Sequence, residues 1–259
     1  MNFLFTPMVR NLLLINVAVF LATDILHMDL MMFALRNFKS DQFHPVQLLT
    51  HMFMHAGFFH LFGNMFSLIM FGSALEGFWG SKRMLIFYLL CGIGAGIIYS
   101  AVRYYDISKL ESIKNAFKED PSVELIYAFE KESGIRFKEE YKTELENNPH
   151  DMQLAEIWHT ALENELLDII NAPMLGASGA VFGILFAFGY LFPNTELIFL
   201  LFPIPIKAKY FVFLYGLAEL YFGIKQVPGD NIAHFAHLGG MLIGYVIIRY
   251  WKYKRNIFY

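Results

Sequence analysis

Six stretches of mostly apolar residues alternate with polar segments along the chain. They cover residues 11–26, 58–75, 84–102, 172–192, 208–224 and 232–251. A helix rises about 1.5 Å per residue, so roughly 17–25 apolar residues cross the hydrocarbon core of a bilayer. The pattern therefore predicts an all-α, polytopic membrane protein with a bundle of six transmembrane helices.

The composition agrees with a membrane location. Of the 259 residues, 56% are apolar and 17% are charged, whereas a soluble domain carries about 25% charged residues. The formal net charge of −3 argues against nonspecific binding of nucleic acid, which requires a basic surface. The single cysteine, Cys91, excludes an internal disulfide framework.

The basic residues beside the short loops set the expected orientation in the membrane. If the N-terminus is cytoplasmic, the opposite short loops hold only Arg36, Lys39 and Lys225. The cytoplasmic side then collects Arg10, Lys82, Arg83, Lys207, Lys209, Arg249, Lys252, Lys254 and Arg255. We therefore expect a multi-pass protein of a bacterial inner membrane with both termini in the cytoplasm. No small-x-small cleavage site precedes Asp24, so we interpret the first stretch as an uncleaved anchor rather than a signal peptide.

Residues 104–171 interrupt the membrane pattern with a polar segment of 16 acidic and 7 basic side chains. The chain is therefore expected to divide into membrane helices 1–3 at 1–103, an extracytoplasmic insertion at 104–171, and membrane helices 4–6 at 172–259. The insertion is either a solvated hairpin without a catalytic role or a surface that screens or recruits partners.

The insertion itself has a helical pattern. The dipeptide Asp-Pro at 120–121 is typical of a helix start, and Asn-Pro-His-Asp at 148–151 predicts a break. An amphipathic pattern then continues to Ile170. We expect a small acidic helical domain on the outer face.

Four polar side chains stand out in the apolar stretches, where burial in lipid makes them costly and therefore candidates for function. They are His60 and Asn64 in the second stretch, Ser178 in the fourth and His237 in the sixth. These even-numbered helices all enter from the face opposite the N-terminus. Counted from the start of each stretch, all four groups are expected within about 10 Å of that face.

Glycines beside Ser178 and His237 predict that the two helices approach closely. Gly179 is followed by Gly183 at GxxxG spacing, and His237 shares a helix stripe with Gly240 and Gly244. This approach would bring the Ser178 hydroxyl to the His237 imidazole. A histidine at hydrogen-bond distance can act as the general base that turns a serine into a nucleophile.

His60 and Asn64 share one helix face and could donate hydrogen bonds to the oxyanion of a tetrahedral intermediate. Losing one such donor typically lowers the rate about 10²–10³-fold. Taken singly, each group has a plainer interpretation: a serine bonded to its own helix, polar contacts between helices, or a packed histidine. His234 lies three residues before His237, and spacing alone leaves it open as the base; the register of the glycines favours His237.

Three motifs resemble those of the rhomboid intramembrane serine proteases. They are HMFMHAGFFHLFGNM at 51–65, GASG at 176–179 and AHLGGMLIG at 236–244, in this order on the second, fourth and sixth helices. The resemblance spans the membrane core and implies a rhomboid-like bundle. The first loop, residues 27–50, departs from it, because many members carry a Trp-Arg pair where this chain has Leu35-Arg36.

The resemblance implies a role for each residue that matches a motif. Ser178 corresponds to the nucleophile and His237 to the general base and acid, as a dyad without a third carboxylate, and His60 and Asn64 correspond to the oxyanion hole. The supporting positions are a structural histidine at His55, the GASG glycines Gly176 and Gly179, an aromatic ring on the base at Phe182, small helix-contact residues at Gly240 and Gly244, and a structural carboxylate at Glu76.

The predicted function is hydrolysis of a peptide bond in or near a transmembrane segment of another membrane protein, without a cofactor. The partners are transmembrane substrates and the lipid bilayer. Residues 225–231, with Pro228-Gly229, are a candidate lid.

Two alternatives compete with this prediction. One is a relative without protease activity that binds and escorts membrane helices. The other is a metal site, for which the chain has no HExxH motif and for which Asp41 and Asp230, the carboxylates nearest in sequence, lie in loops. The candidate ligands of that site are His51, His55, His60, His234 and His237.

Overall fold

The computed structural model describes residues 5–199, 202–225 and 232–257, and the fold is mainly helical. Of the predicted lid at 225–231, residues 226–231 lie outside the described residues. Along the chain, the main helices are α1 (Pro7–Phe20), α2 (Gln47–Thr50), α3 (Phe58–Ser67), α4 (Ser73–Trp79), α5 (Ser81–Glu119), α6 (Val123–Ser133), α7 (Glu139–Asn147), α8 (Met152–Asn171), α9 (Ser178–Leu191), α10 (Ala208–Lys225) and α11 (His234–Ile257). Short helical turns at Met31–Phe33 and His51–Phe53 lie in the first loop. Two strands, β1 (Glu196–Phe199) and β2 (Phe202–Lys207), join α9 to α10.

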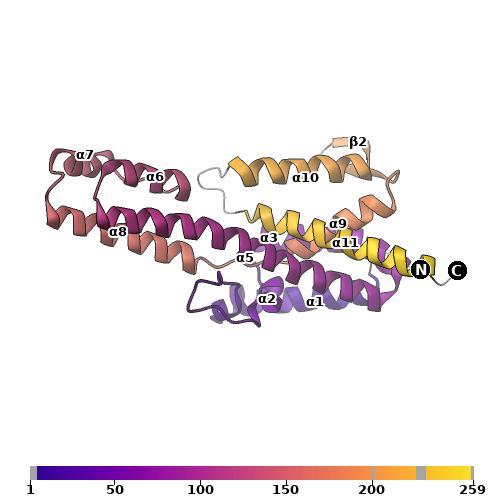
Figure 1. Ribbon diagram of the computed structural model, residues 1–259. Helices are drawn as coiled ribbons and strands as arrows, with labels where there is room; N and C mark the ends of the chain where they lie inside the picture. Colours follow the sequence, from indigo (N-terminus) through magenta and orange to yellow (C-terminus); the bar gives the residue numbers. More distant parts are fainter. Residues whose placement is uncertain (1–4, 200–201, 226–231, 258–259) are drawn as a thin grey trace.

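Apolar helices form an elongated bundle, in which α1 begins and α11 ends at the same end (Figure 1). Within the described residues, three helical segments are long and apolar enough to cross a membrane: Pro7–Ile25, Phe58–Trp79 and Ser81–Glu119. The first of these includes the π-helical turn Leu21–Ile25, and the second joins α3 to α4 through the π-helical turn Leu68–Gly72. Helix α9 is a shorter apolar helix. The prediction of a helical membrane protein is confirmed at this level.

Helix α9 lies at the centre of the bundle between α5 and α11. Most of its residues are buried, including both glycines of its GxxxG pair. A methyl group built on Gly240 of α11 would overlap the carbonyl oxygen of Gly179. One built on Gly183 would lie 2.6 Å from the Cys91 sulfur of α5 and 3.0 Å from the Gly240 oxygen. Glycine at these positions therefore lets the helix backbones touch.

The carboxylate of Glu76 caps the first membrane helix. It accepts hydrogen bonds from the backbone N–H groups of Met8 and Val9, each at 2.9 Å. These groups belong to the first turn of α1, where no helical carbonyl is available to them. Its contacts are therefore structural.

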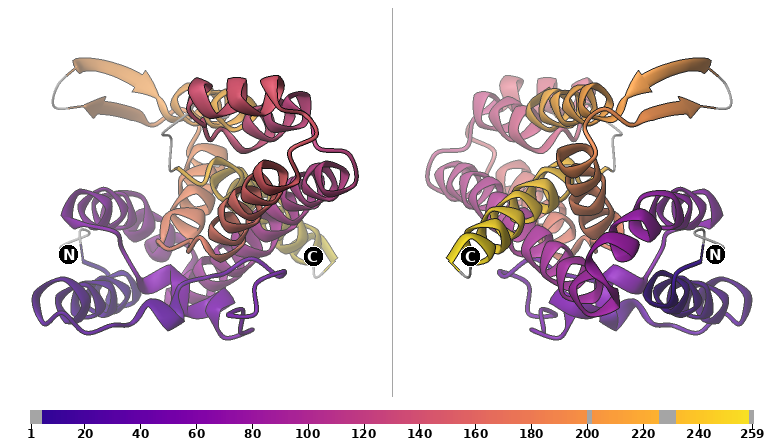
Figure 2. Two further views of the ribbon diagram at one scale, coloured as in Figure 1. Left: turned by 90° about the vertical axis from the view of Figure 1, so that its left-hand side faces the viewer. Right: turned by 90° about the vertical axis from the view of Figure 1, so that its right-hand side faces the viewer.

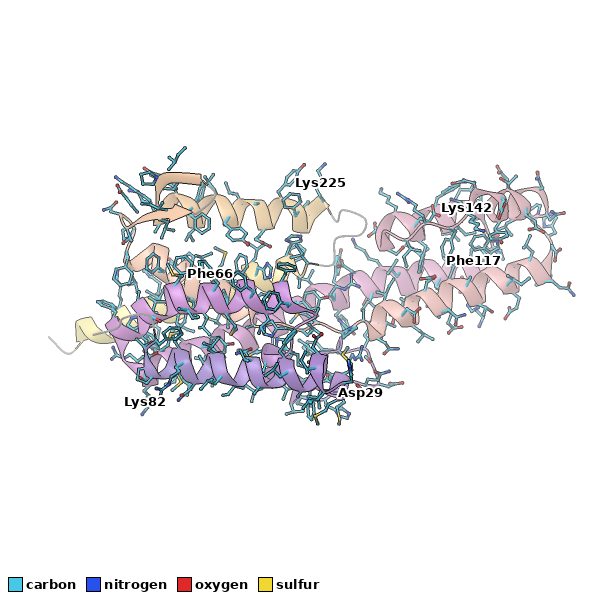
Figure 3. All side chains as sticks on the ribbon, turned by 180° about the vertical axis from the view of Figure 1, so that it is seen from behind. Asp29, Phe66, Lys82, Phe117, Lys142 and Lys225 are labelled. Carbon is cyan, nitrogen blue, oxygen red and sulfur yellow. The ribbon has the colours of Figure 1, made fainter. Side chains whose placement is uncertain are left out.

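Helix α5 continues beyond the bundle and joins α6, α7 and α8 to form a separate lobe (Figure 1). The lobe has its own apolar core, made of Ile107, Leu110, Phe117, Ile126, Phe129, Leu145, Trp158, Leu162, Leu166 and Ile170. Figure 3 shows Phe117 and Lys142 in this lobe, far from Lys82 at the opposite end of the molecule. The predicted break at 148–151 is present, and the Asp151 side chain caps α8 by accepting from the N–H groups of Gln153 and Leu154.

A buried lysine holds the outer turns of the lobe together. The Lys142 side chain is 1% exposed, and its Nζ lies 3.0 Å from Oε1 of Glu130, whose side chain is 3% exposed. Glu139 accepts a further hydrogen bond from Nζ at 2.7 Å. The Tyr127 ring lies 4.4 Å from the same nitrogen. Burial of this charge is tolerated because all these groups compensate it.

Three local expectations were wrong. Helix α9 starts at Ser178 instead of residue 172, because Gly176 has a φ of 128° that turns the chain just before it. Asp120 ends α5 instead of starting the next helix, and α6 begins after Ser122. The fold is also not purely α-helical, because β1 and β2 pair antiparallel in a hairpin that projects from the bundle (Figure 2).

The contact between α9 and α11 predicts a large effect of a single methyl group. Gly240→Ala should lower the free energy of unfolding by about 1–3 kcal/mol or more, because rigid backbone atoms would have to move. Gly77→Ala is the matched control, since a methyl group there meets nothing within 4 Å. Thermal unfolding in detergent micelles measures both, and equal melting temperatures would contradict the described contact.

The buried lysine predicts a local loss of stability in the lobe. Lys142→Ala leaves the Glu130 carboxylate without its main partner and should destabilise α6 and α7 by about 3–5 kcal/mol. Lys138→Ala removes a lysine whose side chain is 73% exposed, and it should change stability by less than about 1 kcal/mol. Amide hydrogen exchange of α6 and α7 reports the difference. Equal protection in the two variants would contradict this account of the ion pair.

Candidate active site

The segment that leads into Ser178 is anchored by the first loop. The backbones of Leu35 and Met174 exchange two hydrogen bonds, at 2.9 and 2.8 Å. Next to this pair, the Arg36 guanidinium donates to the carbonyl oxygen of Asn171. Leu35-Arg36, the dipeptide that departs from the family pattern, therefore contacts the chain between α8 and α9.

Gly176 shapes the turn that precedes α9. Its N–H donates to the carbonyl oxygen of His51 at 2.9 Å. A methyl group built on Gly176 would lie 2.7 Å from His60 Nε2 and 3.7 Å from Ser178 Oγ. Two of the candidate site residues thus lie around one point, although they come from α3 and α9.

His51 itself supports this turn. Burial lowers the pKa of His51 to about 4, and the hydrogen bond with Gln47 opposes that shift only in part. The ring is therefore neutral at physiological pH. Its Nδ1 lies 2.7 Å from the Gln47 carbonyl oxygen, so the proton resides on Nδ1. The His51 ring thus donates to the preceding helical turn, and the backbone oxygen of His51 accepts the hydrogen bond from Gly176.

His60 and Asn64 lie one turn apart on α3. The Ala56 N–H points at His60 Nδ1 at 3.4 Å. If His60 is neutral, an acceptor at Nδ1 leaves its proton on Nε2, the atom beside the Ser178 turn. Asn64 is 6% exposed, and its amide nitrogen donates to the His60 carbonyl oxygen at 2.8 Å, which uses one of its two N–H groups. The His55 ring packs edge-on against His60 at 5.0 Å.

His237 lies on α11 and is 8% exposed. The Phe182 ring of α9, one turn after Ser178, stacks on its imidazole with 4.0 Å between ring centroids and 7° between planes. On the imidazole edge, Nδ1 lies 2.8 Å from Glu219 Oε2. The ring is thus fixed on one face and along one edge.

The structure also places a carboxylate at the site that the sequence interpretation missed. Glu219 belongs to α10 and is 5% exposed. The same oxygen, Oε2, lies 2.6 Å from Nδ1 of His234. Glu219 was overlooked because only carboxylates near the histidines in sequence were considered. Its position as an acidic residue inside an apolar stretch was a signal that could have identified it.

Ser178 and His237 come from helices in direct contact, but no hydrogen bond joins the two side chains among the described residues. Ser178 is the first residue of α9 and is half-buried. The contact between Gly179 and Gly240 lies near both side chains. Gly179 directly follows Ser178, and Gly240 lies about one helical turn after His237. The candidate residues therefore form two groups. One contains Ser178, His60 and Gly176, and the other contains Phe182, His237, Glu219 and His234.

One group of side chains could hold a metal ion. The donor atoms of Glu219, His234 and His237 lie within 4.8 Å of one another. Within the described part of the chain, His51, His55 and His60 belong to no such group. The metal alternative from the sequence therefore involves a carboxylate and only two of its five histidines.

The fold and this arrangement define a helical membrane protein with a half-buried serine and with buried histidine and carboxylate groups between its apolar helices. The sequence model of the rhomboid domain matches residues 42–108 and 153–254, which is more than half of the chain. The chain belongs to the rhomboid family. Both matched parts carry candidate site residues, and the unmatched residues 109–152 lie within the lobe.

Individual relatives agree with this membership. The chain is 27% identical to RHOMBOID-like protein 12, mitochondrial, of Arabidopsis thaliana over 91% of its own length and 55% of that protein's length. It is 38% identical to Rhomboid protein 1, mitochondrial, of Saccharomyces cerevisiae over 35% of its own length and 25% of that protein's length. The chain thus spans about half of the former relative and a quarter of the latter.

The crowding at Gly176 predicts a partial rescue between two substitutions. Gly176→Ala should lower the free energy of unfolding by about 1–3 kcal/mol, because it adds backbone strain and a clash with the His60 ring. Adding His60→Ala removes the clash but leaves the strain, so the double variant should recover part of the loss. Thermal unfolding in micelles gives the values.

Gly57→Ala is the control, because Gly57 is extended and a methyl group there meets nothing within 4 Å. If the effects of Gly176→Ala and His60→Ala simply add, His60 does not lie against this turn.

Proposed function

We propose that the protein is an intramembrane serine protease that hydrolyses peptide bonds in or near transmembrane segments of other membrane proteins. Ser178 is the nucleophile and His237 is the general base and acid. The observation that carries this proposal is the fixed His237 ring, which stacks on Phe182 one turn after Ser178. This stacking holds the His237 imidazole against the helix that bears Ser178, and an imidazole within hydrogen-bond reach of a serine can activate its hydroxyl.

The start of α9 supplies further chemistry. Ser178 is at the first helical position, where backbone N–H groups have no partner within the helix. His237 accepts the hydroxyl proton as the hydroxyl oxygen attacks the substrate carbonyl, and it later returns that proton to the leaving amine. Unliganded sites often hold the nucleophile and base at a longer distance than the reacting complex does. We therefore expect the Ser178 hydroxyl and the His237 imidazole to come together when substrate binds.

Groups on α3 and at the start of α9 stabilise the oxyanion. His60 Nε2 lies beside the Ser178 turn, and its proton can be donated to the tetrahedral oxygen. Asn64 keeps a second amide N–H beyond the one bonded to the His60 carbonyl. Both groups come from one helix that packs near α9, so they act together with the backbone N–H of Ser178.

We propose six membrane crossings, with α10 and α11 as the last two. Both ends of the described chain then lie on one side, and the Ser178 turn lies near the other. Figure 3 places Lys82 at one end of the bundle, and Asp29 and Lys225 toward the end that meets the lobe. The excess of basic residues on the Lys82 side supports its facing the cytoplasm in a bacterial inner membrane. The relatives named above are mitochondrial, and their membrane is the other candidate.

Cleavage requires access to the peptide carbonyl of the substrate. An intact helix commits each carbonyl to an i to i−4 hydrogen bond. The preferred substrates are therefore transmembrane segments with glycine, proline or small polar residues near the cleaved bond, since these weaken the helix locally.

Cleavage of a fluorescent transmembrane substrate by purified protein in liposomes tests the proposal, with the cut site mapped by mass spectrometry. Ser178→Ala and His237→Ala should each lower kcat at least about 10³-fold with folding intact. Ser108→Ala is the control, because its hydroxyl only bonds to the Tyr104 carbonyl in the lobe.

Cleavage retained by Ser178→Ala would reject Ser178 as the nucleophile, and absence of cleavage by the wild type would favour the helix-binding escort protein. Loss of wild-type activity in strong chelators would instead support the metal alternative.

A further inference from the structure

We propose that Glu219 is a positioning residue that holds the proton of His237 on Nδ1 and thereby leaves Nε2 free to accept the proton of Ser178. This inference rests on the proposed function and adds a carboxylate to it. The family resemblance implied a dyad with no such third group. Glu219 acts through His237 and does not contact the substrate.

The geometry assigns this role through a single oxygen atom. Oε2 of Glu219 lies 2.8 Å from Nδ1 of His237 and 2.6 Å from Nδ1 of His234. An ionised carboxylate only accepts hydrogen bonds, so both ring nitrogens must donate. A neutral imidazole carries one proton, and placing it on Nδ1 leaves the lone pair on Nε2. The carboxylate therefore selects the tautomer that general-base catalysis requires.

Because all three side chains are buried, the Glu219 carboxylate and the two imidazoles depend on one another. Glu219, His234 and His237 are each less than 9% exposed and lie between α10 and α11. An ionised carboxylate in such surroundings is strongly disfavoured unless donors compensate it. The two imidazole N–H groups provide that compensation from one side of α11. His234 thus helps to hold Glu219 in place. The role of base goes to His237, because His237 stacks on Phe182 of the helix that bears Ser178.

Aromatic rings restrict both imidazoles further. Phe182 stacks on His237 at 4.0 Å, and Phe222 stacks on His234 with 5.9 Å between centroids and 25° between planes. Each histidine is therefore held by a ring on its face and by Glu219 along its edge. Rotation of His237 would break both contacts at once, so Nε2 keeps its direction.

The same hydrogen bond also assists the chemical step. When Nε2 takes the serine proton, the imidazole becomes a cation whose Nδ1–H already points at a carboxylate. An ionised partner strengthens this bond, so the cationic state gains more from Glu219 than the neutral state does. Glu219 therefore stabilises the transition state without accepting a proton itself.

The first test compares Glu219→Gln and Glu219→Asp in the liposome cleavage assay. Glutamine keeps the size of the side chain but can donate to Nδ1, which stabilises the wrong tautomer. In serine proteases with an orienting aspartate, the corresponding amide lowers kcat by about 10⁴-fold. We expect Glu219→Gln to lower kcat by about 10²–10⁴-fold with KM changed less than about threefold. Glu219→Asp keeps the charge and should recover part of this loss.

The control is Glu163→Gln, which alters an exposed carboxylate of the lobe and should leave kcat unchanged. A Glu219→Gln variant with wild-type kcat would overturn the inference while leaving the proposed protease intact. A Glu219→Asp variant that melts like the wild type but recovers none of the lost kcat would overturn the role of the carboxylate charge.

The second test needs no activity and no variant of Glu219. Magnetic resonance of protein labelled with ¹⁵N-histidine distinguishes Nδ1–H from Nε2–H imidazoles, and loss of signals in His237→Gln identifies the relevant ring. We expect His237 and His234 to carry Nδ1–H at neutral pH. An Nε2–H tautomer at His237 would overturn the inference even if Glu219→Gln fails to fold.

The two proposals fail separately. Absence of Ser178-dependent cleavage together with an Nδ1–H tautomer would reject the protease but retain the positioning of His237 by Glu219.

Discussion

The direct backbone contact between α9 and α11 is the constraint on which the rest of the site depends. Lipid tails provide little driving force for helices to associate, so close packing of small residues must hold them together. Here the Gly240 position has no room for a methyl group beside the Gly179 carbonyl. The contact lies within a turn of Ser178 and of His237. The packing that stabilises the bundle and the approach of the helices that bear Ser178 and His237 therefore have the same origin.

Much of the membrane core could be predicted from the sequence, because its determinants are local. Apolar stretches long enough to cross a bilayer marked the helices, and glycine spacing marked the contact between α9 and α11. The start of α9 was misplaced because hydropathy does not register a left-handed glycine such as Gly176. The β1–β2 hairpin was missed because residues 193–207 were interpreted only as the loop between two apolar stretches.

The candidate site could also be predicted only in part from the sequence. Ser178, His237, His60 and Asn64 stood out because each is polar within an apolar stretch. Glu219 has the same property, but its histidine partners lie 15 and 18 residues later on a different helix. Only the packing of α10 against α11 makes them neighbours. Residues on one helix face are separated by a fixed number of positions in the sequence. A carboxylate that bonds to a side chain on another helix has no such fixed separation from it.

The first loop also joins the lobe to the membrane core. Lys39 pairs with Glu111 of α5, and the Ser40 hydroxyl donates to the Asn171 side chain at the end of α8. Arg36 holds the Asn171 carbonyl, and Leu35 holds Met174 a few residues further along. The last turn of α8 and the segment that leads into Ser178 are thus both held by the first loop. A tilt of α8 relative to the bundle would therefore strain the contacts of this loop before it displaces Ser178.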